Sequence, residues 1–289
     1  MNQGRSWFRL TALVLGFAFL YIPIVSLIVY SFNESKLVTV WAGFSTKWYG
    51  ELLRNGPILN AAWLSLKIAA LTASLAVVLG TLAGLALARF GPFKGRTLLS
   101  GLTTAPLVMP EVITGLSMLL LFVAMEQAIG WPAGRGMTTI VIAHVTFTMA
   151  YVTVIVQSRL AQMDDSLEEA AMDLGARPAK VFFLITLPII APALMSGWLL
   201  AFTLSIDDLV TTSFVAGPGS STLPMVIYSK VRLGVSPDVN ALATILVGIV
   251  AVGVAIAGYT MSRQQKARER DAQMALAANQ QMIESLKKG

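Results

Sequence analysis

Cysteine is absent from this sequence, histidine occurs once, and charged residues are scarce. Without cysteine the chain cannot form disulfides, thiol nucleophiles or iron–sulfur ligands, and a single histidine also excludes zinc sites built from cysteine and histidine. We therefore expect no metal or other cofactor in this chain. Charged residues make up 12% of the 289 positions and hydrophobic residues 56%, whereas about a quarter of a soluble domain is charged. This composition is typical of an integral membrane protein with no separate soluble domain.

Six apolar runs are long enough to cross a bilayer as helices. A helix rises 1.5 Å per residue, so about 20 apolar residues span the hydrocarbon layer. The first run is bulky to its end and lacks a small-residue cleavage site, which indicates an uncleaved span. We predict an all-α polytopic membrane protein with six transmembrane helices at residues 10–32, 68–88, 97–125, 137–157, about 185–206, and 239–261.

The distribution of lysine and arginine predicts the orientation of these spans. If the N terminus is cytoplasmic, fourteen basic residues fall in cytoplasmic segments and six in outer loops, which is the bias that insertion requires. Both termini are therefore predicted to be cytoplasmic. The predicted organisation is an N-terminal segment at residues 1–9, a transmembrane domain at 10–262 with its core from about 60, and a solvated, helical tail at 263–289.

Small residues and prolines predict how the spans pack and bend. Four small residues recur at four-residue spacing in the second run and put one smooth face towards a neighbouring helix: Ala76, Gly80, Gly84 and Ala88. Proline removes a backbone donor and clashes with the preceding turn. We therefore expect bends or breaks in the third span at Pro106 and Pro110, and near the start of the fifth at Pro188 and Pro192.

Three carboxylates lie in or beside the predicted spans. Glu111 falls midway along the third span, directly after Pro110, and an ionisable group at that depth is costly unless it is paired or hydrated. It would suit a dicationic substrate, or it would pair with Lys67 or a backbone donor to hold the bent helix. Asp207 and Asp208 follow the fifth span towards the outside. They would receive a cation there, or they would brace a helix end.

The long outer loop after the fifth span carries an aromatic and a basic residue four positions apart, Tyr228 and Arg232. In a helix they share one face, where the ring would hold an ammonium group by cation–π attraction. Arg232 would close the mouth of a pathway by pairing with Asp207 or Asp208, with ordinary packing as the alternative. His144 has no acidic neighbour in sequence, so hydrogen-bonded packing is favoured over a proton relay.

The loop at residues 158–184 carries helix signals. Ser166 and Glu169 have the spacing of a capping box, and Asp164 and Asp165 suit the positive end of a helix. Gly175 is placed to end this helix in the left-handed conformation. Pro178 fits the first turn of a second helix. The sequence predicts a helix, a sharp turn and another helix at the cytoplasmic surface.

The spacing within this loop resembles that of a known family. Glu169-Ala170-Ala171, then Gly175, then Ile185, Leu187 and Pro188 is similar to the EAA loop in permease subunits of bacterial ATP-binding-cassette importers of type I. The resemblance implies that the loop at residues 158–184, which we call the EAA loop, forms a coupling helix that docks in a groove of an ATPase subunit. The residues to which it assigns this role are Glu168, Glu169, Ala170, Ala171, Asp173, Leu174 and Gly175.

The resemblance extends over nearly the whole chain. The segments at residues 41–49, 105–111, 204–209 and 236–242 resemble the polyamine permeases, most of all the second permease subunits of putrescine importers, with spermidine permeases next. This implies a heteromeric importer in a bacterial inner membrane. Its other parts would be a homologous permease, two copies of an ATPase and a periplasmic polyamine-binding protein.

The chain lacks the glycine-rich loop ending in Gly-Lys-Ser/Thr that binds nucleotide phosphates. We therefore predict a non-catalytic subunit, with ATP and magnesium bound by the partner ATPase. The alternative is a secondary amine transporter driven by an ion gradient, with Glu111 and His144 as coupling groups, although no internal repeat supports it. An intramembrane enzyme using Asp207 and Asp208 lacks a second catalytic group at matching depth.

Overall fold

The computed structural model describes residues 3–37, 40–233 and 237–253, together with 255, 259 and 263. Within these residues the chain is helical, and its β-structure is limited to an isolated antiparallel bridge between Asn33 and Phe44. Two compact units are present. One consists of residues 55–233, and the other combines the residues before 55 with those after 233.

The terminal unit contains α1 (Gln3–Tyr30), α2 (Lys47–Arg54) and a helix at Pro237–Gly253. Large apolar side chains remain exposed along α1, as expected of a helix that meets lipid. The loop between α1 and α2 is held by buried polar contacts. The Trp48 indole N–H donates to the Asn33 carbonyl at 2.6 Å, and the Asn33 side-chain amide donates to the Val40 carbonyl at 2.7 Å.

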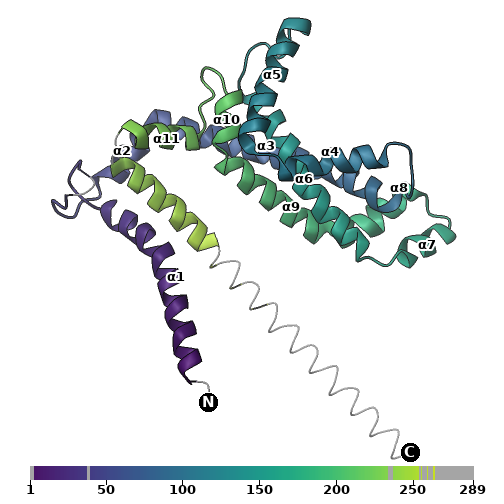
Figure 1. Ribbon diagram of the computed structural model, residues 1–289, viewed down its shortest axis with the longest axis horizontal. Coiled ribbons are helices and arrows are strands. Elements are labelled where there is room, and N and C mark those ends of the chain that lie inside the picture. Colours follow the sequence, from purple (N-terminus) through teal and green to yellow (C-terminus); the bar gives the residue numbers. More distant parts are fainter. Residues whose placement is uncertain are drawn as a thin grey trace, which may run out of the picture. The chain divides into compact units, whose positions relative to one another are not determined.

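Three long helices form the centre of the unit at residues 55–233 and run side by side (Figure 1): α3 (Gly56–Arg89), α6 (Met137–Ala161) and α9 (Leu187–Asp207). The stripe of small residues on α3 explains their close approach. A Cβ added at Gly80 would lie 2.8 Å from Val152, and one at Gly84 would lie 3.0 Å from Val156, both on α6. The predicted role of the stripe in packing is confirmed.

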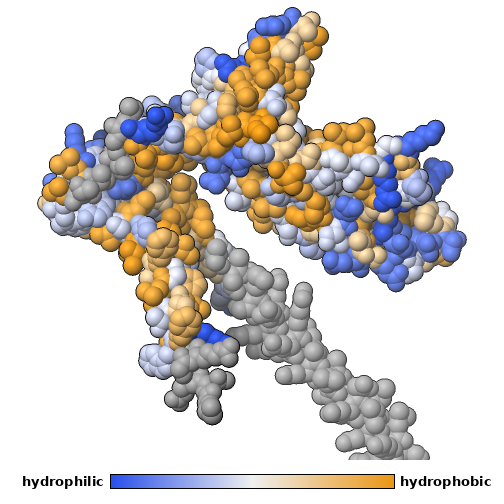
Figure 2. Space-filling model, viewed as in Figure 1, coloured by the Kyte–Doolittle hydropathy of each residue, from blue (hydrophilic) through white to orange (hydrophobic). Residues whose placement is uncertain are grey.

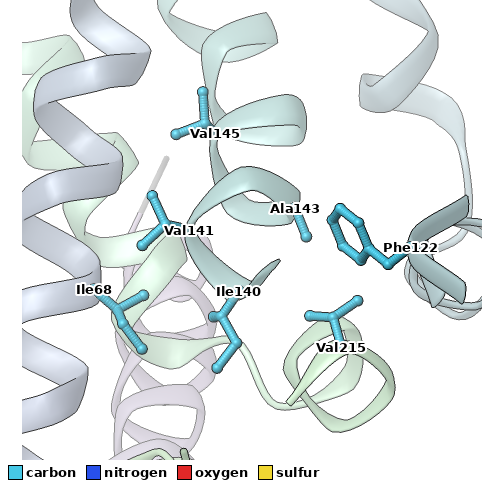
Figure 3. Close-up of a cluster of buried hydrophobic side chains, with 7 residues drawn as sticks. All are labelled: Ile68, Phe122, Ile140, Val141, Ala143, Val145 and Val215. Carbon is cyan, nitrogen blue, oxygen red and sulfur yellow. The ribbon is translucent and has the colours of Figure 1, made fainter. Parts of the chain in front are cut away.

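A second group of buried apolar side chains joins α3 and α6 to α5 (Glu111–Ile129) and α10 (Val210–Val215). Phe122 of α5 and Val215 of α10 converge on Ala143 of α6, while Ile68 of α3 lies on the other side of the cluster (Figure 3). The helix α11 (Leu223–Leu233) follows. Its first N–H donates to the Ser65 hydroxyl of α3 at 2.8 Å.

The predicted third span is divided in two. It forms α4 (Arg96–Val108) and α5, because Met109 and Pro110 take extended backbone angles between them. The expected break is thus confirmed, and Glu111 begins a helix instead of lying in the middle of one. Before α9 the chain forms the short helix α8 (Pro178–Val181) and the π-helical turn η1 (Phe182–Thr186).

Five helices in the described part of the chain are long and apolar enough to cross a membrane. They include the four predicted spans that begin near residues 10, 68, 137 and 185, and α5 from the divided third span. The predicted sixth span at residues 239–261 is represented by Pro237–Gly253. The rest of that span, apart from isolated positions, and nearly all of the tail at 263–289 lie outside the described residues. Apolar side chains cover much of α1 and α5, whereas polar ones gather at α7 (Figure 2).

Candidate functional site

A cavity of about 480 Å³ opens where α4 gives way to α5. Its walls come from this break, from α6 and from the end of α9, so segments distant in sequence meet there. All three carboxylates singled out in the sequence line it. Neither lysine nor arginine lines this cavity. The lining residues are Pro106, Leu107, Met109, Pro110, Glu111, Thr114, Phe147, Tyr151, Thr203, Leu204, Asp207, Asp208, Leu209, Val210 and Thr211.

Glu111 and Asp207 are exposed at this cavity. Within the described residues neither side chain makes a hydrogen bond or an ion pair. The alternative partner of Glu111, Lys67, lines a separate cavity, where its ammonium lies 5.1 Å from the centre of the Trp63 ring. The cavity therefore presents two carboxylates whose charge is not neutralised by the rest of the described chain.

Asp208 is bound into the fold instead. Its Oδ2 accepts hydrogen bonds from the backbone N–H and the hydroxyl of Thr212, both at 2.7 Å, and its Oδ1 accepts one from the Thr211 N–H at 3.3 Å. His144 Nε2 lies 3.2 Å from the same Oδ2, and its Nδ1 lies 2.7 Å from the Ser205 hydroxyl. The Asp208 carboxylate thus caps α10 and ties it to α6. The favoured interpretation of His144, hydrogen-bonded packing, agrees with these contacts.

Tyr228 and Arg232 lie on α11 and share one face, as their spacing predicts. The Arg232 guanidinium lies 5.7 Å from the centre of the Tyr228 ring. Neither residue lines the carboxylate cavity. The expected pairing of Arg232 with Asp207 or Asp208 is not formed among the described residues: Asp207 makes no ion pair there, and the Asp208 carboxylate contacts Thr212 and His144.

The EAA loop folds largely as its sequence predicts. It contains α7 (Ser166–Asp173), then Gly175 with a φ of +82°, then α8 beginning at Pro178. The predicted capping box is wrong, because Ser166 already belongs to the helix. Instead the Asp164 carboxylate accepts from the Ser166 N–H at 3.0 Å, and this hydrogen bond lowers the pKa of Asp164.

Helix α7 is a surface element with no buried residue. Its apolar side chains Leu167 and Met172 are exposed, and Leu174, which follows it, is 90% exposed. Grouped apolar side chains on an exposed surface are typical of protein-binding sites. Of the assigned coupling residues, two are half-buried, Glu168 and Ala171, whereas the others are exposed: Glu169, Ala170, Asp173, Leu174 and Gly175.

One residue of this region was missed in the sequence. Arg89, the last residue of α3, places Nη1 2.5 Å from the Asp165 carboxylate and Nε 3.0 Å from that of Glu168. The Glu168 contact is an ion pair without the alignment of a hydrogen bond. The sequence marked Arg89 only as a basic residue at a span end, and 76 positions separate it from Asp165, so no local pattern links them.

The sequence matches known proteins along most of its length. Residues 76–268 match the family described as "Binding-protein-dependent transport system inner membrane component". The chain belongs to this family. It is therefore a multi-pass inner membrane component of a transport system.

Two members of this transport family are similar to this chain along most of its length. The chain is 61% identical to the putrescine transport system permease protein PotI of Escherichia coli (strain K12), over 94% of this chain and 96% of that protein. It is 41% identical to the spermidine/putrescine transport system permease protein PotC of the same organism, over 86% and 91%. These relatives are transport permeases.

The fold also agrees with this family. A crystal structure of a bacterial ABC transporter involved in the import of the acidic polysaccharide alginate aligns with a TM-score of 0.68 at 16% identity, over 89% of this chain and 96% of the other. The all-α arrangement is thus that of an ABC importer transmembrane domain. Among the described residues no cluster of three or more metal-ligating side chains occurs.

Proposed function

We propose that this chain is a permease subunit of an ATP-driven polyamine importer whose main substrate is putrescine. It forms half of the translocation pathway, and a homologous permease forms the other half. Two ATPase subunits and a periplasmic polyamine-binding protein complete the complex. High identity to PotI and to PotC along the chain supports this assignment. The observation that supports a cationic amine as substrate is the cavity, in which Glu111 and Asp207 have no positively charged partner among the described residues.

The chemistry of the cavity suits a linear diamine. Putrescine carries two ammonium groups joined by an apolar chain, and the cavity combines two free carboxylates with apolar walls. A cation in such a site replaces its hydration shell with carboxylate and hydroxyl oxygens, while its methylene groups contact Phe147 and Leu204. Glu111 and Asp207 would bind the ammonium groups, and Tyr151 offers a further oxygen or an aromatic face.

The other candidates have supporting parts in this proposal. Asp208 holds the wall of the cavity through α10. Tyr228 and Arg232 lie towards the predicted outer side, where an incoming amine would compete with the guanidinium for the Tyr228 ring. Selectivity and affinity reside in the separate binding protein, so a weak site here is sufficient.

Energy enters through the EAA loop. The exposed residues of α7 and its following turn would fill a groove of the ATPase subunit, with Leu174 as the apolar contact. This chain binds neither ATP nor magnesium, which the partner supplies. The proposed transmembrane domain is at residues 10–262. Its loop at 158–184, both termini and the tail at 263–289 lie on the cytoplasmic side in this proposal.

Uptake of labelled putrescine into proteoliposomes that contain the complete complex tests the proposal. We expect uptake to require ATP and the ATPase subunit and to be blocked by vanadate. Changing Glu169→Lys should abolish ATP-driven uptake, whereas Glu51→Lys, an exposed charge reversal on α2, should retain it. Uptake by this chain without an ATPase, driven by a proton or sodium gradient, would contradict the proposal.

A further inference from the structure

The end of α3 is tied to the EAA loop by charge. Arg89 is the last residue of this 34-residue helix, and its side chain is 17% exposed. Its guanidinium meets Asp165, the residue before α7, and Glu168 in the first turn of α7. Arginine suits this position because its planar fork can contact two carboxylates at once without losing its charge.

Glu168 is central to these contacts of Arg89 with the EAA loop, which we call the Arg89 joint. One carboxylate oxygen faces Arg89, and the other accepts a hydrogen bond from the Thr186 hydroxyl at 2.5 Å. Thr186 is buried and ends the π-helical turn that leads into α9. A single side chain of α7 therefore contacts the end of α3 and the start of α9.

Few other contacts fix α7 to the membrane helices. The helix has no buried residue, and a cavity of about 370 Å³ is lined by α7, the end of α3, α8 and η1. The backbone connects α7 to α9 through Gly175, α8 and η1, but it gives no direct connection to α3. The Arg89 joint supplies that connection.

We propose that Arg89 is a positioning residue for energy coupling, which transmits a displacement of α7 to α3 as well as to α9. This inference rests on the proposed function, because it assumes that an ATPase moves α7. Through α3 the displacement would reach α6 along the small-residue stripe, and α11 through the Ser65 contact. The coupling between α7 and the membrane helices then depends on α3 and on its packing against α6 and α11.

A brace that only stabilises the fold would behave differently from a coupling joint. Loss of a brace lowers the amount of assembled complex, so uptake and ATP hydrolysis fall together. Loss of a coupling joint leaves hydrolysis running while less substrate moves for each ATP. The ratio of amine transported to ATP hydrolysed separates the two.

The experiment uses the complete complex in proteoliposomes with its loaded binding protein and labelled putrescine. Arg89→Gln should lower the ratio of putrescine transported to ATP hydrolysed by about tenfold, within the usual range of coupling between sites. Arg159→Gln is the matched control, because this exposed arginine at the end of α6 has no acidic partner within the described residues. Glu168→Gln keeps the shape and an oxygen for Thr186, and it serves if Arg89→Gln fails to assemble.

A charge exchange sharpens the test. The triple variant Arg89→Glu/Asp165→Asn/Glu168→Arg should recover a large part of the ratio, because it rebuilds the attraction with reversed sign and removes the Asp165 charge that would repel a carboxylate at position 89. An unchanged ratio in Arg89→Gln and Glu168→Gln would overturn the inference, as would a parallel fall in uptake and hydrolysis. If the wild-type complex shows no ATP-dependent uptake, the proposed function itself fails, so the two failures are distinguishable.

Discussion

Two acidic sites in the unit at residues 55–233 differ in how their charge is balanced. At the cavity, Glu111 and Asp207 have no cationic partner in the described chain, although apolar helices surround them. At the EAA loop, Asp165 and Glu168 share Arg89. The first arrangement leaves negative charge available for a cationic ligand, whereas the second uses its charge to join helices.

This difference predicts that neutralising a carboxylate has different effects on stability at the two sites. Removing one member of a half-buried ion pair leaves the other charge uncompensated and weakens the structure. Removing a carboxylate that has no partner relieves repulsion or desolvation and leaves the fold intact. Variants at the two free carboxylates should therefore affect transport without affecting stability, and variants at built-in carboxylates should loosen the helices that these carboxylates join.

The largest effect is expected at the two free carboxylates. Each of Glu111→Gln and Asp207→Asn should lower putrescine uptake by about tenfold to a hundredfold, because a hydrogen bond to a charged group contributes roughly 1.5–3 kcal/mol. The double variant should approach background. Initial rates in proteoliposomes measure the effect, and thermal unfolding of the purified complex should change little.

Glu126→Gln is the matched control for this prediction. Glu126 lies at the other end of α5, where it accepts from the Gly134 N–H at 3.0 Å and does not line the cavity. Its variant should transport normally. Normal uptake by the double variant at the cavity would remove these carboxylates from the pathway.

A smaller effect, on stability, is expected at the neighbouring Asp208. Asp208→Ala should destabilise the chain by about 2–3 kcal/mol, since it removes the cap of α10 and the carboxylate that contacts His144. Asp207→Ala should stay within about 0.5 kcal/mol of wild type, as is usual for exposed positions. Denaturant-dependent unfolding in detergent compares the two, and equal losses would contradict the distinction.

The sequence predicts the cavity only in part. Pro110 made a break in the third span expected, and a break is what brings Glu111 to an open position. Asp207 and Asp208 look equivalent in sequence, yet they separate because α9 ends between them and Asp208 alone reaches the N–H groups of α10. Such a difference depends on backbone direction at a helix end, which composition and spacing do not give.

The EAA loop shows the same limit. Gly175 and Pro178 have conformational requirements that are local, so the turn and the second helix were predictable. The capping box was wrong because Asp164, two positions before Ser166, competes for the same N–H. The role of Arg89 was not predictable, since it depends on a contact between residues far apart in the chain.

The smallest effect expected is the pH dependence of the Asp164 cap. The Ser166 N–H lowers the pKa of Asp164 in the folded state. A lowered pKa contributes stability at pH values above the ordinary pKa of the group, and that stability is lost as the pH falls through the lowered value. Because Asp164 is fully exposed, solvent screens the charge and the contribution is small.

Asp164→Asn tests this cap, because the amide oxygen still accepts from Ser166 but does not titrate. We expect α7 of the wild type to loosen more than that of the variant as the pH falls from about 5 to about 3, measured by hydrogen exchange of the α7 amides relative to α6. Asp165→Asn should weaken α7 already at neutral pH, since it removes a partner of Arg89. Identical pH profiles for wild type and Asp164→Asn would show that Asp164 contributes shape alone, and that the charges binding α7 are those facing Arg89.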